Sequence, residues 1–399
     1  MKVLPFDEAD LSEWDRLCDS SADAWLFHLS SWVTLESNFF FPGSNASFAV
    51  HDGHKIVAVQ PLYVATLGLG AWSETLVHSG IHRHTGLALL DGLEPGVIKA
   101  VRSVAMRRIE ILAKHVSADR IQLNIQNLAP KRTNGECSEI PFWVSGFGYF
   151  LGVGIGPGGL APAPGLATCC ADQMVELTMP EESLFSALDE SCRRAVRKAQ
   201  GQCLSCNEGA GDDVVRDYYA LAERSAKRTG ESLAPRGYYE DLWNALGPQG
   251  SCRFLFVCSA GQKIAALLLL IDKGAAHFLG GVSDPEFLPM RVNDFMHWSA
   301  IVWAKRQGLH VYRLGPVFPE LPDDWPVAKV SRFKGKFGGK SVPIIQGVAF
   351  GIRKNMQTLP VSRLRLSSQS KGMQSKTGIG GGSCRTPFAL GSRRKCTET

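Results

Sequence analysis

The sequence KIAALLLLID, Lys263–Asp272, contains the longest apolar run in the chain and decides the fold. Glycine turns at Gly261 and Gly274 bound it, and strands are expected on either side, at Arg253–Ser259 and His277–Val282. Because the run is apolar at consecutive positions, both faces of its strand are expected to be covered. The three segments predict a meander inside a packed sheet.

Helices and strands surround this meander. Alternation predicts a strand at Gln173–Leu177, and helical spacing predicts a helix that starts near Thr178–Glu181 and ends near Gly201. Further elements are expected as helices at Asp212–Thr229, Pro235–Gly247 and Val292–Gln307, a strand at His310–Leu314, a short helix at Ala328–Lys336, and a strand at Val342–Ala349.

The first half repeats this order in outline. Its expected elements are helices at Ala9–Cys18, Ser30–Ser37 and Pro95–Val116, and strands at Ala46–His51, Lys55–Val64 and Arg120–Asn124. One hairpin sequence, Gly53–Ala58 (GHKIVA), echoes Gly261–Ala266 (GQKIAA). The echo and the shared order favour two copies of one α/β (α+β) fold, each a mixed sheet with flanking helices.

Length and composition fit this division. The 399 residues allow about two domains. The content of 45% hydrophobic and 20% charged residues excludes wholesale disorder, collagen and coiled coil. The longest apolar run, Ile264–Ile271, is far shorter than the roughly 20 residues of a membrane-spanning helix, so no transmembrane segment is expected. The early acidic residues argue against a signal peptide, and eleven cysteines suit a reducing, cytoplasmic location.

Charge is unevenly placed along the chain. Ten Lys/Arg and one acid follow Ile352, a net charge of +9, while the preceding residues carry a net charge of −4. This distribution argues against a nucleic-acid binder that uses its whole surface. The predicted division is an N-terminal domain at 1–150, a Gly/Pro-rich linker at 151–171, a C-terminal domain at 172–350, and a basic disordered tail at 351–399.

Three stretches contain residues typical of metal or phosphate sites, but none has the full pattern of such a site. The lone Cys203-Leu204-Ser205-Cys206 lacks a second cysteine pair, and His78, His82 and His84 lack a carboxylate or thiolate pattern, so no metal is expected. Gly152–Gly159 has the glycines of a phosphate-binding loop, but prolines stand where its helix would begin. A linker is the favoured interpretation of that stretch.

The strongest chemical signal is Ser331–Lys340, SRFKGKFGGK. Two phenylalanines anchor the segment, and two glycines let its backbone approach a ligand. A lysine held here could stabilise a carboxylate, a phosphate or a developing oxyanion. A solvated basic turn is the equally weighted alternative.

A second basic cluster is Arg193-Arg194-Ala195-Val196-Arg197-Lys198. On a helix its like charges pair at i,i+4, which costs a few tenths of a kcal/mol per pair. The cluster either binds an anion, together with Arg228 on the next helix, or is a solvated face. Asp284 could act as a base, although an Asp before Pro more often starts a turn.

Taken together, these stretches resemble the FemAB-like branch of the GNAT acyltransferase superfamily, which includes BioF2-like acetyltransferase domains. Further matching pieces are Phe27–Trp32, Gln60–Leu62, Gly280–Asp284, Asn293–Trp303, Gly308 and Leu314–Gly315. The resemblance spans roughly residues 1–350, is best in the second half, and implies two tandem GNAT-like domains.

The resemblance also implies a function and a set of site residues. The protein would be a bacterial acyltransferase or aminoacyltransferase, acting on an amine of a cell-envelope precursor in peptidoglycan synthesis or of a polysaccharide-related acceptor. Lys334 would stabilise the reacting acyl group and Asp284 would assist. The substrate would contact Arg194, Arg197, Arg228, Asn293, Arg332 and Trp32. No tightly bound cofactor is implied, and the acyl donor would be aminoacyl-tRNA or acyl-CoA.

Some features leave other functions open. The long helical arm of some peptidoglycan members is absent, which weakens the expectation of charged tRNA as a partner. An acyl-CoA-dependent N-acetyltransferase acting on a small molecule is the alternative, and Arg83–Ala88 formally matches the CoA loop of such enzymes. A non-catalytic protein that binds an anionic glycan would need the arginines but not Lys334. The tail could alternatively hold nucleic acid or an anionic membrane.

Overall fold

The apolar run folds as β12 (Gln262–Asp272), the middle strand of the expected meander. It pairs antiparallel with β11 (Cys252–Ser259) and β13 (Ala275–Ser283), and its central residues are buried on both faces. The structure is a computed structural model that describes residues 1–67, 73–80, 85–133, 142–153, 170–211, 213–322 and 324–350.

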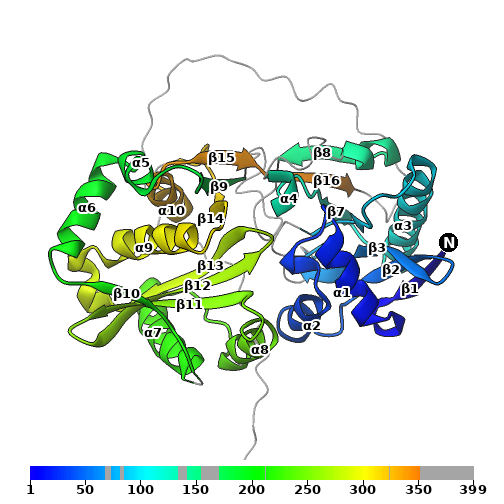
Figure 1. Cartoon of the computed structure of the whole chain (residues 1–399). Helices are drawn as coiled ribbons and strands as arrows, with labels where there is room; N and C mark the ends of the chain where they lie inside the picture. Colours follow the sequence, from blue (N-terminus) through cyan, green and yellow to red (C-terminus); the bar gives the residue numbers. More distant parts are fainter. Residues whose placement is uncertain are drawn as a thin grey trace, which may run out of the picture.

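The C-terminal half is built on a seven-stranded sheet in the order β10-β11-β12-β13-β14-β9-β15. Its other strands are β10 (Ser205–Glu208), β14 (Val311–Val317), β9 (Ala171–Glu176) and β15 (Lys340–Pro343). The helices are α5 (Glu181–Ser186), α6 (Glu190–Gln200), α7 (Val214–Thr229), α8 (Arg236–Leu246), α9 (Val292–Arg306) and α10 (Pro326–Gly335). One face packs against α5, α6 and α9, and the other packs against α7 and α8 (Figure 1).

The N-terminal half has two smaller sheets. The first contains β1 (Lys2–Pro5), β2 (Phe48–Asp52), β3 (Lys55–Gln60) and β6 (Ala88–Leu89). The second has the order β4-β5-β7-β16-β8, made by β4 (Tyr63–Leu67), β5 (Glu74–His78), β7 (Arg120–Asn124), β16 (Ile345–Phe350) and β8 (Phe150–Val153). Helices α1 (Leu11–Ser20), α2 (Ser30–Phe39) and α3 (Pro95–His115) pack on them.

The two halves share one motif, as two copies of one fold predict. In each, an antiparallel strand leads into a parallel pair joined by a helix: α3 joins β5 to β7, and α9 joins β13 to β14. The hairpins with similar sequences lie at matching places, β2–β3 and β11–β12, and both turn at a glycine with positive φ. The mixed α/β fold, with two similar halves that each combine sheets and flanking helices, is confirmed.

Three elements predicted as continuous are split. The strand expected at Lys55–Val64 breaks at Pro61 into β3 and β4, and the strand expected at Val342–Ala349 breaks after Pro343 into β15 and β16. Proline has no N–H for the strand ladder, so each break is a natural place for the chain to change sheets. The helix expected up to Gly201 becomes α5 and α6, because Asp189 caps a new start by accepting from Ser191 N at 2.8 Å.

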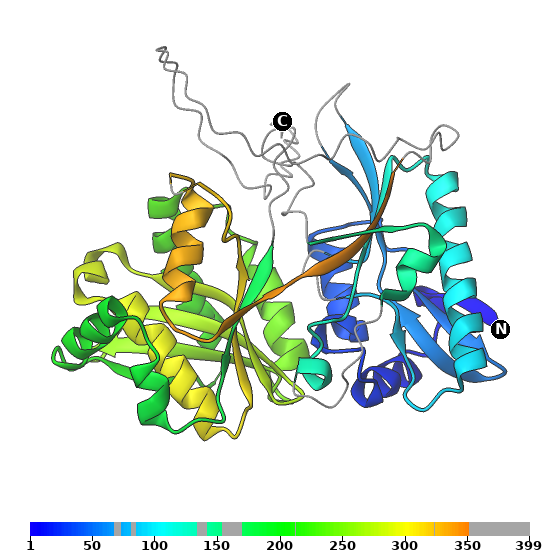
Figure 2. The same cartoon turned by 90° about the horizontal axis from the view of Figure 1, so that it is seen from above.

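β16 links the halves. It leaves β15 in the C-terminal sheet and inserts between β7 and β8 of the N-terminal half, crossing the molecule in Figure 2. A shared apolar cluster also joins the halves, since Trp25, Phe27 and Trp32 pack with residues of α7 and α8.

Two polar contacts reinforce this junction. Lys273 Nζ donates to the carbonyl oxygens of Cys18, Ser21 and Ala24 at 2.6–2.9 Å. Arg313, fully buried, donates to Asp172 and to Leu128 O. These bonds satisfy buried polar groups from both halves, so the halves form a continuous structure.

Candidate functional site

The parallel strands β13 and β14 separate soon after they pair. Their register holds from Ala275↔Val311 to His277↔Arg313. Beyond it, β13 stays with β12, while β14 continues alongside β9. Gly315, at φ +81°, lies on β14 after the separation. Strands that diverge leave backbone groups without a ladder partner, so this opening is a natural place for a ligand.

Lys334 lies at this opening. It is in the last turn of α10, only 8% exposed, and its Nζ donates to Pro316 O at 2.9 Å. A Cβ placed on Gly315 would lie 3.5 Å from the same Nζ, so the glycine leaves the ammonium room. Lys334 Nζ also lies 5.9 Å from the centre of the Phe278 ring on β13. The predicted lysine is therefore held at the point where the strands part.

Aromatic rings pack beneath Lys334. His297 of α9 lies 4.7–5.6 Å, between ring centres, from Phe278, Phe333 and Phe337, and its Nδ1 is 3.0 Å from the Tyr312 hydroxyl. Burial lowers the pKa of His297 to about 3, and the Lys334 charge adds to the effect. His297 is thus a neutral side chain held in place beneath the opening. Its low pKa makes it a weak proton acceptor at neutral pH.

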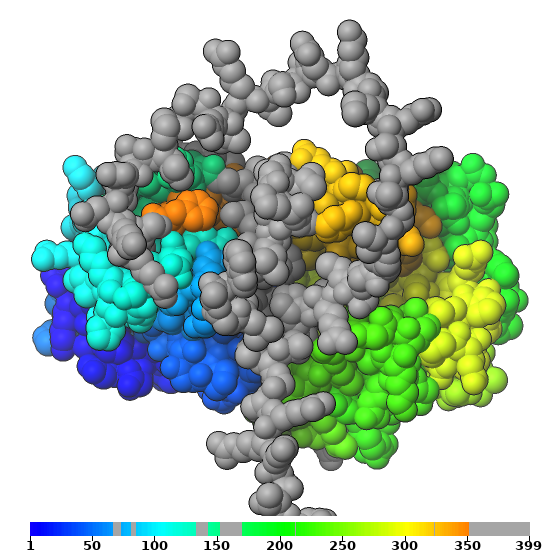
Figure 3. Space-filling view, turned by 180° about the vertical axis from the view of Figure 1, so that it is seen from behind, coloured from blue at the N-terminus to red at the C-terminus, as the bar shows by residue number. Residues whose placement is uncertain are grey.

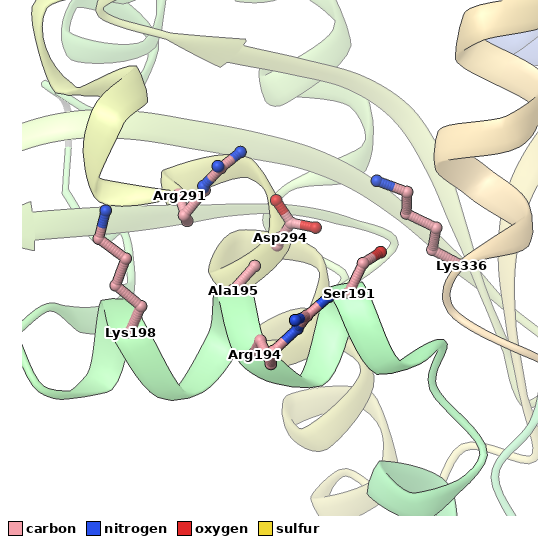
Figure 4. Close-up of a pocket in the computed structure, with 7 residues that line it drawn as sticks. All are labelled: Ser191, Arg194, Ala195, Lys198, Arg291, Asp294 and Lys336. Carbon is pink, nitrogen blue, oxygen red and sulfur yellow. The ribbon is translucent and has the colours of Figure 1, made fainter.

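A cationic pocket of about 260 Å³ lies near the end of α10 (Figure 4). It lies between α6, the start of α9 and the C-cap of α10. Its lining residues are Ser191, Arg194, Ala195, Lys198, Arg291, Asp294 and Lys336. Four of these are cations, and the first turn of a helix adds positive potential. The pocket suits an anion, and Lys336 stands two residues from Lys334 in the sequence.

Asp294 is the one acid among the described residues that line the pocket. It projects between Arg291 and Lys336 in Figure 4. Burial raises the pKa of its carboxyl, while the charges of Lys336 and Arg291 pull the pKa down. The protonation of Asp294 therefore adjusts the net charge that the pocket presents.

The basic cluster on α6 divides into two functions. Arg193 bonds the carbonyls of Ser186 and Leu188, and Arg197 stacks over Phe185 with its Cζ 5.3 Å from the ring centre. Arg194 and Lys198 instead line the pocket. Of the two i,i+4 pairs, Arg194 and Lys198 fit the anion-binding interpretation, whereas Arg193 and Arg197 contact neighbouring residues of the fold.

The other predicted site residues are scattered. Asp284 caps the turn at Pro285–Met290 and pairs with Arg224, Nε to Oδ2, at 2.8 Å, so its carboxylate holds structure together. Trp32 is fully buried in the junction between the halves, out of reach of a substrate in this conformation. Asn293 is half-buried in the first turn of α9, and Arg228 and Arg332 are exposed; none of these three lines the pocket.

The remaining motifs lie elsewhere or find structural explanations. Gly86, from the formal CoA-loop match, packs so closely that a Cβ there would be 2.3 Å from Asn124 O. Residues 83 and 84 of that stretch, most of the predicted linker and the tail lie outside the described residues. Burial raises the pKa of the Cys206 thiol to about 12, and Cys203 is exposed. Within the described ranges, no group of three or more His, Cys, Asp or Glu could hold a metal.

Comparison with known proteins begins with the C-terminal half. Residues 187–325 match the model of a family described as acetyltransferase (GNAT) domain. This segment is a GNAT domain. It contains the separated strands, α9 and most of the pocket, while Lys334 lies just beyond it. No curated protein matches the chain.

Solved structures extend the likeness to both halves. FemX superposes with a TM-score of 0.61 at 13% identity, covering 87% of this chain and 97% of its own. The C-terminal domain of a putative lysylphosphatidylglycerol synthetase from Agrobacterium fabrum gives 0.51 at 11% identity, covering 86% and 92%. The resemblance to the FemAB-like branch is confirmed at the level of the fold. None of the described helices is long and apolar enough to cross a membrane.

Proposed function

We propose that the protein transfers an activated acyl group to an amine, with Lys334 at the reacting carbonyl. The supporting observation is the buried ammonium of Lys334 at the opening between β13 and β14 of a GNAT domain. A cationic hydrogen-bond donor that is fixed in an opening with little water stabilises developing negative charge better than one in solvent.

The proposed acyl transfer passes through a tetrahedral intermediate. The amine nitrogen attacks the acyl carbon, a C–N bond forms, and the carbonyl oxygen becomes an oxyanion near the Lys334 Nζ. The tetrahedral intermediate then collapses, the bond to the leaving oxygen or sulfur breaks, and the amine's proton ends on that leaving group. Lys334 stays protonated and binds the carbonyl oxygen throughout.

The donor carries phosphate, and the cationic pocket binds it. Both donors weighed from the sequence, aminoacyl-tRNA and acyl-CoA, join an activated acyl group to phosphates. Arg194, Lys198, Arg291 and Lys336 surround a space that suits such an anion. We favour an aminoacyl-type donor and an amine of a cell-envelope precursor or polysaccharide as the acceptor, because the fold over both halves is that of FemX. An acyl-CoA-dependent N-acetyltransferase is the second candidate, since the matching family is described as an acetyltransferase.

Replacing Lys334 tests the central step. Lys334→Met keeps the volume of the side chain but removes its charge, and kcat should fall about 100- to 1,000-fold, as when an oxyanion donor is lost. Lys329→Met, at an exposed position on the same helix, is the matched control and should keep its activity. Full activity in Lys334→Met, with acyl transfer followed by mass spectrometry, would remove Lys334 from the mechanism.

Thermal shift identifies the donor. Purified protein is titrated with acetyl-CoA and, separately, with a nonhydrolysable aminoacyl-tRNA mimic, because a ligand that binds the folded state raises Tm. The Arg194→Ala/Lys198→Ala variant should bind the donor that raises Tm at least about tenfold more weakly, because it loses contacts to phosphate. Arg236→Ala, which removes an exposed cation on α8, should leave binding unchanged. A shift with acetyl-CoA alone selects the second candidate, and a shift with neither donor contradicts the donor assignment.

A further inference from the structure

Large apolar side chains gather at one edge of the N-terminal half. Phe150 is 66% exposed, Leu151 40% and Phe350 54%. Phe150 on β8 stands opposite Val348 on β16, and Phe350 follows two residues later. Because side chains alternate along a strand, Phe150 and Phe350 share one face of the sheet. β8 is an edge strand of this sheet, and Figure 3 shows the orange end of the described chain at the surface of this half.

The sequence that follows this patch is strongly basic. Residues 351–399, which begin directly after Phe350, contain ten Lys/Arg and one acid. The rest of the chain carries a net charge of −4. Exposed aromatic side chains and concentrated positive charge are therefore joined by one peptide bond.

We propose that Phe150 and Phe350, here called the β8–β16 patch, dock on an anionic lipid bilayer, with residues 351–399 supplying the electrostatic attraction. Aromatic side chains insert at the boundary between headgroups and acyl chains, and basic segments are drawn to anionic headgroups. Stable peripheral binding takes two such signals, and the patch and the basic segment supply one each. The mildly acidic remainder would be repelled by the same surface, so the basic segment is required.

Two other occupants fit the same features less well. A nucleic acid would use the positive charge but gain little from exposed phenylalanines at a sheet edge. A second copy of the chain would bring another net charge of +9 to the same edge, and like charges oppose that pairing. A bilayer uses both features together. This inference does not depend on the proposed function, because membrane binding is measured without turnover.

Vesicle flotation tests the proposal on the full chain. Phosphatidylcholine vesicles with about 30% phosphatidylglycerol should bind the protein at least tenfold more tightly than phosphatidylcholine alone, and salt should weaken that binding. Truncation after Ile352 should lose most of the binding. Phe150→Ser/Phe350→Ser should weaken binding about fivefold or more through lost apolar insertion. Both phenylalanines are largely exposed, so the variant should fold, and circular dichroism checks this.

Ile111→Ser is the matched control. Ile111 is 52% exposed on α3 of the same half but lies outside the patch, and its replacement should leave vesicle binding unchanged. The proposal is overturned if the full chain fails to float with anionic vesicles, or if Ile111→Ser weakens binding as much as the phenylalanine pair. It is also overturned if the chain binds a DNA duplex more tightly than vesicles and the phenylalanine variant binds both unchanged.

Discussion

Lys334 combines two roles that a solvent-exposed lysine would not have. Its ammonium bonds Pro316 O at the opening between the strands, and its stem is buried near Phe278. Replacing Lys334 with alanine would therefore do more than remove the charge. In the structure, alanine would also leave a void, and Lys334→Met separates loss of charge from loss of packing.

Asp294 is predicted to control the charge of the pocket. Its raised pKa means that the carboxyl ionises above its ordinary range, so as pH rises through that pKa a negative charge appears beside the bound anion. Anion affinity should therefore fall with rising pH. Asp294→Asn removes this charge and should bind sulfate about tenfold more tightly at pH 7, or ~1.4 kcal/mol.

Isothermal titration with sulfate, whose charge is constant above about pH 4, measures this dependence from that pH upward. The wild type should lose affinity as pH rises, and Asp294→Asn should change less. Glu240→Gln, on the exposed side of α8, serves as the control and should behave like the wild type. Equal pH profiles for the wild type and Asp294→Asn would contradict the prediction.

Sequence reasoning identified part of the candidate site. It singled out Lys334 and Arg194, because a basic cluster that costs helix stability asks for an explanation. It missed Arg291 and Asp294, since nothing in their local sequence shows that the start of α9 packs against α6. Trp32 was predicted to contact the substrate, but it packs against α7 and α8 of the other half. The spacing of residues along a helix does not show that a second half of the molecule will bury one of its faces.

Among the elements, β15 depends on Gly339, which lets it approach β9. A Cβ on Gly339 would lie 2.0 Å from Met174 O, a backbone atom, and Gly339 also has φ +79°. Gly261 shares the positive φ, at +82°, but has open space around its Cβ position. The two positions separate backbone strain from steric clash.

Alanine substitutions should therefore differ in cost. Gly261→Ala carries only the strain of positive φ, about 1–2 kcal/mol. Gly339→Ala adds a clash that forces β15 away from β9, so its loss of stability should exceed that of Gly261→Ala by about 2 kcal/mol or more. Urea unfolding of both variants measures the difference. Equal losses would mean that β15 yields without cost.

Most helices and strands could be predicted from the spacing of apolar residues and from the glycines and prolines that end them. Gly230 ends α7 at φ +71°, and the apolar spacing of α3 and α9 gave bounds close to those observed. The path of β16 could not be predicted. Its alternation marks a strand, but its partner β7 lies more than 200 residues earlier, and no local pattern encodes so distant a pairing.

For the whole molecule, three buried histidines predict sensitivity to acid. Burial lowers the pKa of His28 and His297 to about 3 and of His78 to about 4. These histidines stay neutral in the folded state but take up protons near pH 6.5 when unfolded. Their stabilising effect is complete above pH 6.5 and is lost as pH falls towards those lowered values.

Each histidine should remove about 1.4 kcal/mol of stability per pH unit in that window. The buried carboxyls with raised pKa, Asp15, Asp272 and Asp294, act in the opposite direction. Comparison with a single variant therefore isolates the effect. His78→Asn can still accept from Gly80 N, and it should lose less stability than the wild type between pH 7 and 5 in urea unfolding. Parallel curves would show that His78 contributes nothing to the pH dependence.

The strand that crosses between the halves also has a consequence for biosynthesis. β8 ends at Val153, but the strand that separates it from β7 begins only at Ile345. At about 5–20 residues per second, a ribosome needs on the order of 10–40 s to make the intervening chain. During that interval the N-terminal sheet has an open slot between β7 and β8, with unsatisfied ladder groups on both sides. The nascent chain is then exposed to chaperones and to wrong strand partners, and the last strand to emerge closes a sheet that was begun first.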